Sequence, residues 1–421
     1  MTDFQPAKGT KDIAPDEMRR LLFVFDTCRK VFEKYGFVPL ETPAFENFEL
    51  LAAKGGEGVK DEIYFFKDKG GRDLGLRFDM TVGLARFIAN NPSIQKPFKR
   101  YAFGKVWRYD NPQAMRWREF YQLDIDTIGS PQVEADAECL ACFCECLDAL
   151  GIKNYYIRVN NRKLLKAFLA SKSVPEKNMD GWFRTIDKLD KIGKEGVEKE
   201  LLEKGFDKKI VKDVLDNLEK VSKNPEKLKN MEGYQELARL IGLAKAYDIS
   251  EKIKFDISLV RGLEYYTGLV FEIGINDVKV SLGGGGRYDK MIKAFGGPDL
   301  PATGISFGLS RLILYMEEKN LFNLPKNIVK VFVANVDESS KEYAMEVAQE
   351  LRKCGITAET DLMGKKLGKQ LEYASSAGIP FVAIIGRDEI KQKSVKLRNM
   401  KTGNEKMVKI EKLADMLKEN E

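Results

Sequence analysis

The strand-forming pattern of this chain stops at about residue 162 and resumes only near residue 253. In between, Lys, Glu, Asp and Leu dominate, and apolar residues recur at helical spacing, as in Val211, Val214, Leu215 and Leu218. Segments typical of strands lie on both sides. The pattern therefore predicts an all-helical insertion in an α+β domain whose antiparallel sheet is built from two separate parts of the chain.

Segments on both sides of the predicted insertion have the residue patterns of strands. Before the insertion, alternating and β-branched or aromatic residues predict strands at 64–66, 74–79, 99–108, 117–128 and 155–159. After it, they predict strands at 255–260 and 269–273, and one from Ala302 that leads into a helix by Arg311. Other helices are expected to begin near Pro15, Thr81 and Pro131.

The last part of the chain has a different order. After a predicted linker at 324–327, strands and helices alternate as βαβαβ, which predicts a small α/β domain. The predicted organisation has four parts, at 1–161, 162–252, 253–325 and 327–421. The first and third together form the sheet domain, the second is the insertion, and the fourth is the α/β domain.

The 421 residues include no histidine. Because imidazole is the commonest general base and metal ligand, Ser-His-Asp and Cys-His catalysis are excluded. Proton transfer has to use carboxylates, Tyr, Lys, water or the substrate itself. The net charge of +6 permits a polyanionic partner without requiring one. We find neither a signal-peptide pattern nor an apolar run of the roughly 20 residues that span a membrane, and we expect a cytoplasmic enzyme.

Four of the six cysteines follow one another within residues 139–146 as C-x-x-C-x-C-x-C. A Ser-Pro pair before them and Gly151 after them predict one helix over 131–150. Along its axis Cys139 and Cys146 would lie about 10 Å apart, too far to share a tetrahedral ion. We therefore predict small buried helix residues and no zinc.

Two segments concentrate residues suited to substrate binding. Residues 261–268 read Arg-Gly-Leu-Glu-Tyr-Tyr-Thr-Gly before one predicted strand, and the glycines 283–286 are expected to follow the next strand. The planar fork of Arg261 suits a phosphate, and Tyr265 and Tyr266 could read a small polar ring. Glycines let a substrate lie against backbone. The alternative is an ordinary amphipathic hairpin.

A second set of polar residues follows an earlier pair of strands. Arg108 ends one strand, Arg116 precedes the return strand, and Gln122, Asp124 and Asp126 follow at even spacing. Even spacing keeps side chains on one face of a strand. Cations at one end and carboxylates at the other suit an anionic group beside a cationic one. A solvated sheet face is the alternative interpretation.

Two further features have two interpretations each. Asp79 and Thr81, at a strand-to-helix junction, are either acceptors for an ammonium group or a helix cap. The cations Lys391, Lys393, Lys396, Arg398, Lys401, Lys406 and Lys409 face a single acid, Glu405, in the same stretch. They suit either a nucleic-acid backbone or a solvated edge hairpin protected from aggregation.

Together these segments resemble the class II aminoacyl-tRNA synthetases, and among them the histidyl-tRNA synthetases, over nearly the whole chain. Residues 36–43 are similar to the family's first motif, which builds a dimer interface, 103–122 to its second and 304–311 to its third. Residues 261–268 resemble the signature peculiar to the histidine enzymes, and 283–289 its companion. The resemblance implies a cytoplasmic homodimer that ligates L-histidine to tRNA(His) with ATP. It also implies that residues 327–421 bind the anticodon.

The resemblance also implies the site residues. Those expected to hold histidine are Asp79, Thr81, Arg108, Gln122, Asp126, Tyr265, Tyr266 and Gly284. Those expected to hold ATP are Arg108, Arg116, Phe120, Arg261 and Arg311. Arg261, Arg108 and Gln122 are the expected catalytic residues, and Mg²⁺ is expected to arrive with ATP. Asp126, Tyr265 and Tyr266 would face the imidazole, and Arg261 would contact the α-phosphate.

Two residues depart from the family pattern. Ser310 stands where an acid usually precedes the arginine of the third motif, which puts one Mg²⁺-linked contact in doubt. Asp126 stands where Glu is frequent, so its carboxylate would lie one methylene further back. The competing interpretations are a catalytically inactive regulatory subunit of histidine biosynthesis with the same core fold, and another class II synthetase such as a prolyl or threonyl enzyme.

We predict that Arg261→Ala abolishes histidyl-adenylate formation while tRNA binding survives. The α-phosphate would lose its main cation, whereas tRNA is expected to be held mostly by residues 327–421 and the insertion. Histidine-dependent exchange of pyrophosphate into ATP measures the first effect and a tRNA filter-binding titration the second. Near-normal exchange in this variant would remove Arg261 from the proposed site.

Overall fold

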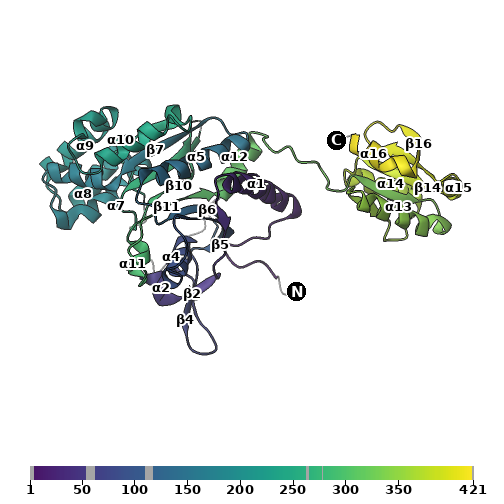
Figure 1. Cartoon of the computed structure of the whole chain (residues 1–421), viewed down its shortest axis with the longest axis horizontal. Helices are drawn as coiled ribbons and strands as arrows, with labels where there is room; N and C mark the ends of the chain where they lie inside the picture. The colour runs from purple at the N-terminus through teal and green to yellow at the C-terminus, as the bar shows by residue number, and fades with distance from the viewer. Residues whose placement is uncertain (1–3, 54–61, 110–116, 262–264, 277, 420–421) are drawn as a thin grey trace. The chain divides into compact units, whose positions relative to one another are not determined.

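The computed structural model describes residues 4–53, 62–109, 117–261, 265–276 and 278–419. The chain divides into two compact units, Met1–Phe322 and Asn323–Glu421, which we call the N-terminal and C-terminal units (Figure 1). The boundary between them lies close to the linker expected at 324–327. The division of the N-terminal unit at residues 161 and 252 stays a prediction.

The N-terminal unit is built on a large sheet. Its described strands, in spatial order, are β1 (Val38–Pro39), β5 (Phe98–Trp107), β6 (Glu119–Ile128), β11 (Ala302–Gly308), β10 (Val278–Arg287), β9 (Leu269–Ile275), β7 (Tyr155–Asn161) and β8 (Ile253–Phe255). All neighbours from β5 to β7 pair antiparallel, and only the outer pairs β1–β5 and β7–β8 are parallel. The predicted α+β architecture with an antiparallel sheet is confirmed.

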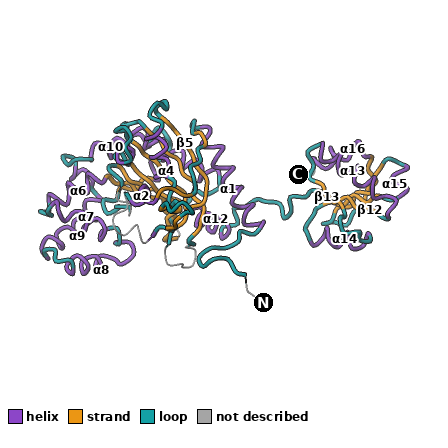
Figure 2. Tube along the Cα trace, turned by 90° about the horizontal axis from the view of Figure 1, so that it is seen from below, coloured by secondary structure: helices purple, strands orange, loops and turns teal. Residues whose placement is uncertain are grey.

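One face of this sheet is covered by helices. Helices α1 (Pro15–Lys34), α5 (Val133–Ala149) and α12 (Leu309–Glu318) bury apolar residues in the same core cluster as Leu123 and Ile125 of β6. Side chains alternate along a strand, so the intervening residues of β6 point to the opposite face. Figure 2 shows the strands gathered within this unit with helices around them. We call the face of the large sheet opposite to helices α1, α5 and α12 the polar face.

The segment between β7 and β8 is helical, as predicted. Its helices are α6 (Arg162–Ser171), α7 (Met179–Ile186), α8 (Leu189–Glu203), α9 (Lys208–Lys223) and α10 (Tyr234–Leu243). Each of these helices buries apolar residues. In α9 the buried residues are Val211, Val214, Leu215, Leu218 and Val221. These residues belong to the same core cluster as the sheet, so the insertion shares one hydrophobic core with it.

A small three-stranded sheet completes the N-terminal unit. It consists of β2 (Phe45–Asn47), β4 (Asp73–Leu76) and β3 (Phe65–Lys67), in that order. Two helices accompany it in the chain, α2 (Phe48–Ala52) and α4 (Thr81–Asn90). A third, α11 (Met291–Ala294), follows β10 and packs against α4. Helix α4 follows β4 directly and brings Asp79 and Thr81 to the polar face.

Two sequence predictions about the strands are wrong. The strand expected at 255–260 ends at Phe255, because Asp256 folds the chain into a turn. Its Oδ1 accepts hydrogen bonds from the backbone N–H of Ser258 at 2.9 Å and from the Ser258 hydroxyl at 2.6 Å. The glycine run lies inside β10 rather than after it, because ladders with β9 and β11 on both sides hold it extended.

The C-terminal unit is the predicted α/β domain. Its strands run β13 (Ala358–Thr360), β12 (Val331–Asn335), β14 (Phe381–Ile385), β15 (Ser394–Asn399) and β16 (Glu405–Lys409) across one sheet. Its helices are α13 (Lys341–Lys353), α14 (Leu367–Ser376), α15 (Arg387–Lys391) and α16 (Ile410–Glu419). The lysine-rich stretch contains the antiparallel hairpin β15–β16 at the sheet edge, and both interpretations of its cations stay predictions.

The expectation about the cysteines is confirmed for the helix and for burial. Cys139, Cys142, Cys144 and Cys146 lie on α5 and are buried. Among the described residues, no three His, Cys, Asp or Glu side chains gather as a metal site. In the described residues, no helix is both long and apolar enough to cross a bilayer.

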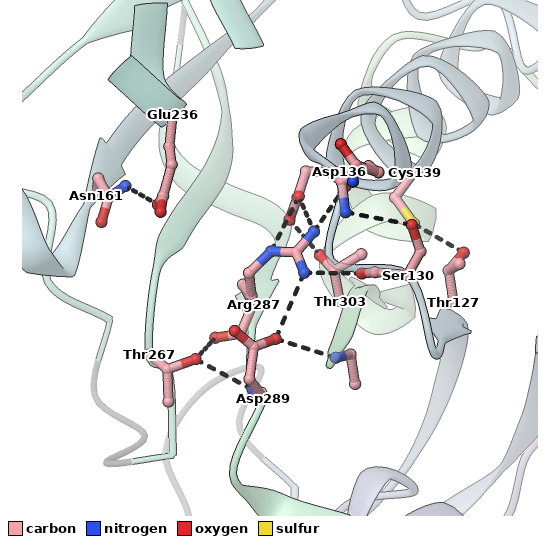
Figure 3. A network of polar contacts seen from close by, with 12 residues as sticks. Thr127, Ser130, Asp136, Cys139, Asn161, Glu236, Thr267, Arg287, Asp289 and Thr303 are labelled. Carbon is pink, nitrogen blue, oxygen red and sulfur yellow. Dashed lines mark hydrogen bonds and ion pairs between the residues drawn. The ribbon is translucent and has the colours of Figure 1, made fainter. Parts of the chain in front are cut away.

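A buried ion pair ties the glycine-rich strand to α5 (Figure 3). Arg287, at the end of β10, donates to the carboxylate of Asp136 and to the backbone oxygens of Ser130 and Gln132, both at 2.9 Å. Asp136 is fully buried, and its other oxygen accepts from the Thr303 hydroxyl at 2.7 Å. The pair therefore fixes β10, β11 and the start of α5 to one another.

We predict that Asp136→Ala destabilises the N-terminal unit by about 3–5 kcal/mol, because it leaves the buried Arg287 cation unpaired. Urea unfolding followed by tryptophan fluorescence measures this, since Trp107, Trp117 and Trp182 are the three tryptophans of the chain and all lie in this unit. Asp299→Ala, which removes an exposed ion pair with Lys293, is the control and should cost under about 1 kcal/mol. Equal effects of the two variants would contradict the assignment.

Candidate functional site

The polar face carries three rows of side chains across the sheet. Strand register places Gln122 beside Gly104 and Gly308 in the first row. In the second row, Asp124 is followed by Ser306, Gly284, Glu272 and Arg158. In the third row, Arg100 is followed by Asp126, Gly304, Gly286, Val270 and Asn160. Cross-strand partners share a face, so acids, amides and cations from distant parts of the chain meet there.

Glycines in these rows leave space that other side chains fill. A Cβ at Gly304 would lie 2.0 Å from Oδ1 of Asp126, and one at Gly286 would lie 3.0 Å from Cδ1 of Tyr266. At Gly284 it would lie 2.3 Å from Nη1 of Arg261. Gly284 was expected to contact histidine. Its position gives it a steric role as well, because it makes room for the guanidinium of Arg261.

Asp79 lies at the start of α4 and serves two purposes. Its Oδ1 accepts from the backbone N–H groups of Thr81 at 3.1 Å and Val82 at 3.0 Å, which is the capping role that the sequence left open. Its Oδ2 is buried without a hydrogen-bond partner among the described residues. Burial raises the pKa of Asp79, while the nearby charge of Arg108 acts in the opposite direction. Capping and ligand binding are therefore compatible.

Asp126 is held by two residues that sequence reasoning missed. Arg100 Nη2 lies 2.7 Å from Oδ2 of Asp126, and the Tyr288 hydroxyl donates to Oδ1. Burial raises the pKa of Asp126, and Arg100 and Tyr288 oppose this effect. Oδ1 of Asp126 therefore has a hydrogen-bond donor in Tyr288, while Oδ2 has an ion-pair partner in Arg100 and accepts no hydrogen bond within the described residues.

Three tyrosines surround this carboxylate. The rings of Tyr265 and Tyr266 are 4.7 Å apart, and those of Tyr265 and Tyr288 are 5.9 Å apart. Tyr265 also interacts with the side chain of Thr81, and burial raises the pKa of all three phenols, so they stay protonated donors. A pocket with phenol hydroxyls and a carboxylate suits a small ring with N–H and N groups.

Five buried acceptors on the polar face accept no hydrogen bond within the described residues: Oδ2 of Asp79, Oε1 of Gln122, Oδ1 of Asp124, Oδ2 of Asp126 and Oδ1 of Asn160. Of these, Oδ2 of Asp126 has an ion pair with Arg100. Gln122 donates to the Ser306 hydroxyl at 3.2 Å, which leaves its oxygen free to accept. Burial, Asp126 and Asp79 raise the pKa of Asp124 to about 7, against the opposing charge of Arg100. Buried acceptors normally find donors, so the oxygens of Asp79, Gln122 and Asp124 suit a cationic or N–H-rich ligand.

The residues expected to hold ATP are only partly brought together. Arg108 donates to the backbone oxygen of Phe78 at 3.0 Å, and its guanidinium lies 5.3 Å from the ring of Phe120. Arg311 is exposed and lies 3.5 Å from the backbone oxygen of Ser281. Phe120 and Ser310 line one groove. Arg116 lies outside the described residues, so its role, like the placing of adenine between Phe120 and Arg311, stays a prediction.

Arg100, Tyr288, Glu272 and Asn160 are among the polar-face residues that sequence reasoning did not assign. Tyr288 belongs to the segment 283–289 together with the glycines. Its position two residues after Gly286 therefore indicated that its side chain could lie near the site. Arg100 offered another indication, because it begins a strand whose partner strand carries Asp126. For Glu272 and Asn160 we see no sequence signal, since strand pairing alone brings them to the site.

Comparison with known proteins gives one consistent family. Residues 9–312 match the family described as Histidyl-tRNA synthetase, and residues 330–420 match the Anticodon binding domain. A histidine–tRNA ligase of Pyrococcus furiosus is 39% identical over 98% of both chains. One of Clostridium tetani is 37% identical over 93% of each.

Solved structures agree. A histidyl-tRNA synthetase from a Nostoc species superposes with a TM-score of 0.86, at 31% identity, and each chain is covered completely. An ATP phosphoribosyltransferase regulatory subunit/histidyl-tRNA synthetase from Bacillus halodurans gives a TM-score of 0.75 at 22% identity. It covers 89% of this chain and 97% of its own, and at that identity the likeness concerns the fold alone.

We predict that Asp124→Asn flattens the pH dependence of stability between about pH 4 and 7. An unfolded Asp titrates near 3.9, whereas the folded pKa of Asp124 is about 7, so the wild type loses stability as the pH rises through this window. The loss is at most about 4 kcal/mol at pH 8. Urea midpoints of the tryptophan transition at pH 5 and pH 8 measure it. An unchanged slope in the variant would refute the raised pKa.

Proposed function

This chain belongs to the histidyl-tRNA synthetase family, and we propose that the polar face of its large sheet binds L-histidine and ATP side by side. Its reaction is the ATP-dependent ligation of histidine to tRNA, which makes it a class II aminoacyl-tRNA synthetase. The observation that carries the site proposal is the group of buried acceptors Oδ2 of Asp79, Oε1 of Gln122 and Oδ1 of Asp124, which accept no hydrogen bond within the described residues.

Histidine offers an ammonium, a carboxylate and an imidazole. The proposed partners of the ammonium are Oδ2 of Asp79, the hydroxyl of Thr81 and Oε1 of Gln122, since the first and last lack hydrogen-bond donors of their own among the described residues. Arg108, with its planar fork, is the proposed partner of the carboxylate. A dry pocket of matched donors rejects side chains that cannot pair with them.

The imidazole is proposed to lie among Tyr265, Tyr266 and the Tyr288–Asp126 pair. Tyr288 donates to Asp126, so its oxygen can still accept an imidazole N–H. This arrangement would let Asp126 act on the ring through a phenol instead of by direct contact. It would compensate for the methylene that Asp lacks relative to Glu.

Activation needs positioning and charge more than a protein base. A carboxylate oxygen of histidine attacks the α-phosphorus of ATP, and the bond to pyrophosphate breaks. Arg108 and Arg261 are proposed to stabilise the charge that develops there, while Arg116, Arg311 and Phe120 hold the distal phosphates and adenine. In the second step a terminal ribose hydroxyl of tRNA attacks the adenylate carbonyl. A phosphate oxygen of the adenylate can take its proton, and AMP leaves.

ATP is used with a divalent metal in this class, and we propose Mg²⁺ held mainly by the phosphates. Among the described residues no cage of three acidic or thiol side chains is present, and Ser310 supplies no carboxylate. This fits a metal that arrives with the nucleotide and neutralises the leaving pyrophosphate. We propose no role for zinc.

The proposed partners are tRNA(His) and a second copy of the chain. The C-terminal unit, which matches the anticodon-binding family, would bind the anticodon, with the lysines of β15–β16 along the phosphate backbone. Dimerisation is proposed through residues 36–43 and their surroundings, because Val38, Phe45 and Phe65 are 48%, 53% and 50% exposed. We propose that the enzyme works in the cytoplasm, where tRNA is charged for translation.

We predict that the purified chain exchanges pyrophosphate into ATP with histidine and with no other amino acid. Its pocket would leave buried donors unpaired with an apolar side chain, which lowers kcat/KM by about 10⁴-fold or more. The measurement is the exchange rate over a panel of amino acids that includes proline and threonine. Absence of exchange in folded protein would favour a regulatory role, and exchange with another amino acid would change the assigned substrate.

A further inference from the structure

Arg261 has a backbone conformation that needs support. Its φ is +62°, in the left-handed region that residues other than glycine rarely adopt. Such a conformation is energetically unfavourable and persists only when its surroundings impose it. The loop 256–260, which links β8 to Arg261, therefore has to be held in place by neighbouring elements.

Asn160 holds the backbone of this loop. It lies on β7, is completely buried, and donates from Nδ2 to the backbone oxygens of Ile257 at 2.8 Å and Leu259 at 2.9 Å. Leu259 also packs in one apolar cluster with Tyr266 and Val270. Together with the turn at Asp256, these contacts fix the residues that precede Arg261.

Glu272 holds the side chain. Nη1 of Arg261 lies 3.3 Å from Oε2 of Glu272, and the other oxygen of Glu272 lies 3.3 Å from Nη1 of Arg158. Arg158 in turn donates from Nη2 to Asp256 at 2.7 Å. The loop that carries Arg261 and the carboxylate that holds its guanidinium are thus tied together by one arginine.

The second row of the polar face shows toward which residues the guanidinium of Arg261 is directed. Glu272 faces Gly284 across the β9–β10 ladder, and Gly284 faces Ser306 across the next. The guanidinium of Arg261 fills the space over Gly284, beyond which lie Ser306 and Asp124. Within the described residues, the side-chain hydrogen bond of Arg261 uses Nη1 alone, so its remaining donors can face a ligand on that side.

We propose that Glu272 and Asn160 are positioning residues for Arg261. Asn160 fixes the loop, and Glu272, itself held by Arg158, fixes the direction of the guanidinium toward the α-phosphate. Neither residue needs to touch substrate. The proposal rests on the proposed function, in which Arg261 stabilises the transition state of activation. Preorganised charge is worth most when it does not have to reorient during the reaction.

The test is histidine-dependent pyrophosphate exchange, with single-turnover adenylate formation for slow variants. Glu272→Gln keeps the shape of a side chain that is 24% exposed, so folding should survive. We expect kcat to fall about 10–100-fold while the KM for histidine stays within threefold, because the contacts to histidine remain. Asn160→Asp keeps the shape of the side chain but loses the two donated hydrogen bonds. It should likewise lower kcat while the KM for histidine stays within threefold.

A double mutant separates positioning from general stability. In an Arg261→Ala background, in which steady-state exchange is expected to be lost, the comparison uses the residual single-turnover rate with enzyme in excess. Glu272→Gln should change this rate by less than twofold, because there is no guanidinium left to direct. Asp190→Asn is the matched control: Asp190 is 67% exposed and also pairs with Arg158 but does not contact Arg261, and it should keep kcat within twofold.

The outcomes distinguish the two proposals. If the wild type lacks histidine-dependent exchange, the proposed function fails. If the wild type is active but Glu272→Gln retains its kcat, or loses the same factor in the Arg261→Ala background, the positioning role is overturned. The positioning role is supported if Glu272→Gln lowers kcat in the otherwise wild-type enzyme but has no further effect in the Arg261→Ala background.

Discussion

Four glycines on the polar face leave the room on which the rest of the site depends. Gly104, Gly284, Gly286 and Gly304 lie where a Cβ would collide with Arg77, Arg261, Tyr266 and Asp126, respectively. Three of these four neighbours are expected to act on substrate. A sheet with ordinary side chains would fill this space itself. Over three of these glycines the space is filled by Arg261 and Tyr266, which come from one segment, and by Asp126, which comes from a distant strand.

The same face concentrates charge in a protein without histidine. Asp79, Asp124 and Asp126 are buried together, and Arg100 and Arg108 are their nearest compensating cations. Burial raises the pKa of each carboxyl, which costs folding free energy at neutral pH. An ammonium group that pairs with these carboxylates would recover part of that cost, so the burial of the three acids favours binding of a cationic ligand.

Much of the fold followed from local patterns, and the failures have local physical reasons. Alternation in 99–108 and 117–128 predicted β5 and β6, and helical spacing predicted α9, because the periodicity of a buried stripe reflects backbone geometry. The strand predicted at 255–260 has the apolar residues of a strand but carries an Asx turn at Asp256. Gly283–Gly286 resemble a turn by composition, yet strands on both sides pair with them and hold them extended.

The sequence by itself determined the kind of chemistry: the absence of imidazole, the acid and amide spacing of Gln122 and Asp126, and the Arg-Tyr-Tyr segment at 261–266. These are properties of residue type and spacing, which no fold can alter. Only the tertiary structure decided which residues support them. Asn160 and Glu272 are brought together by the pairing of β7 with β9, strands that lie far apart in the chain, whereas Arg100 meets Asp126 through the pairing of the consecutive strands β5 and β6. Such register depends on the packing of the whole sheet, so no local pattern encodes it.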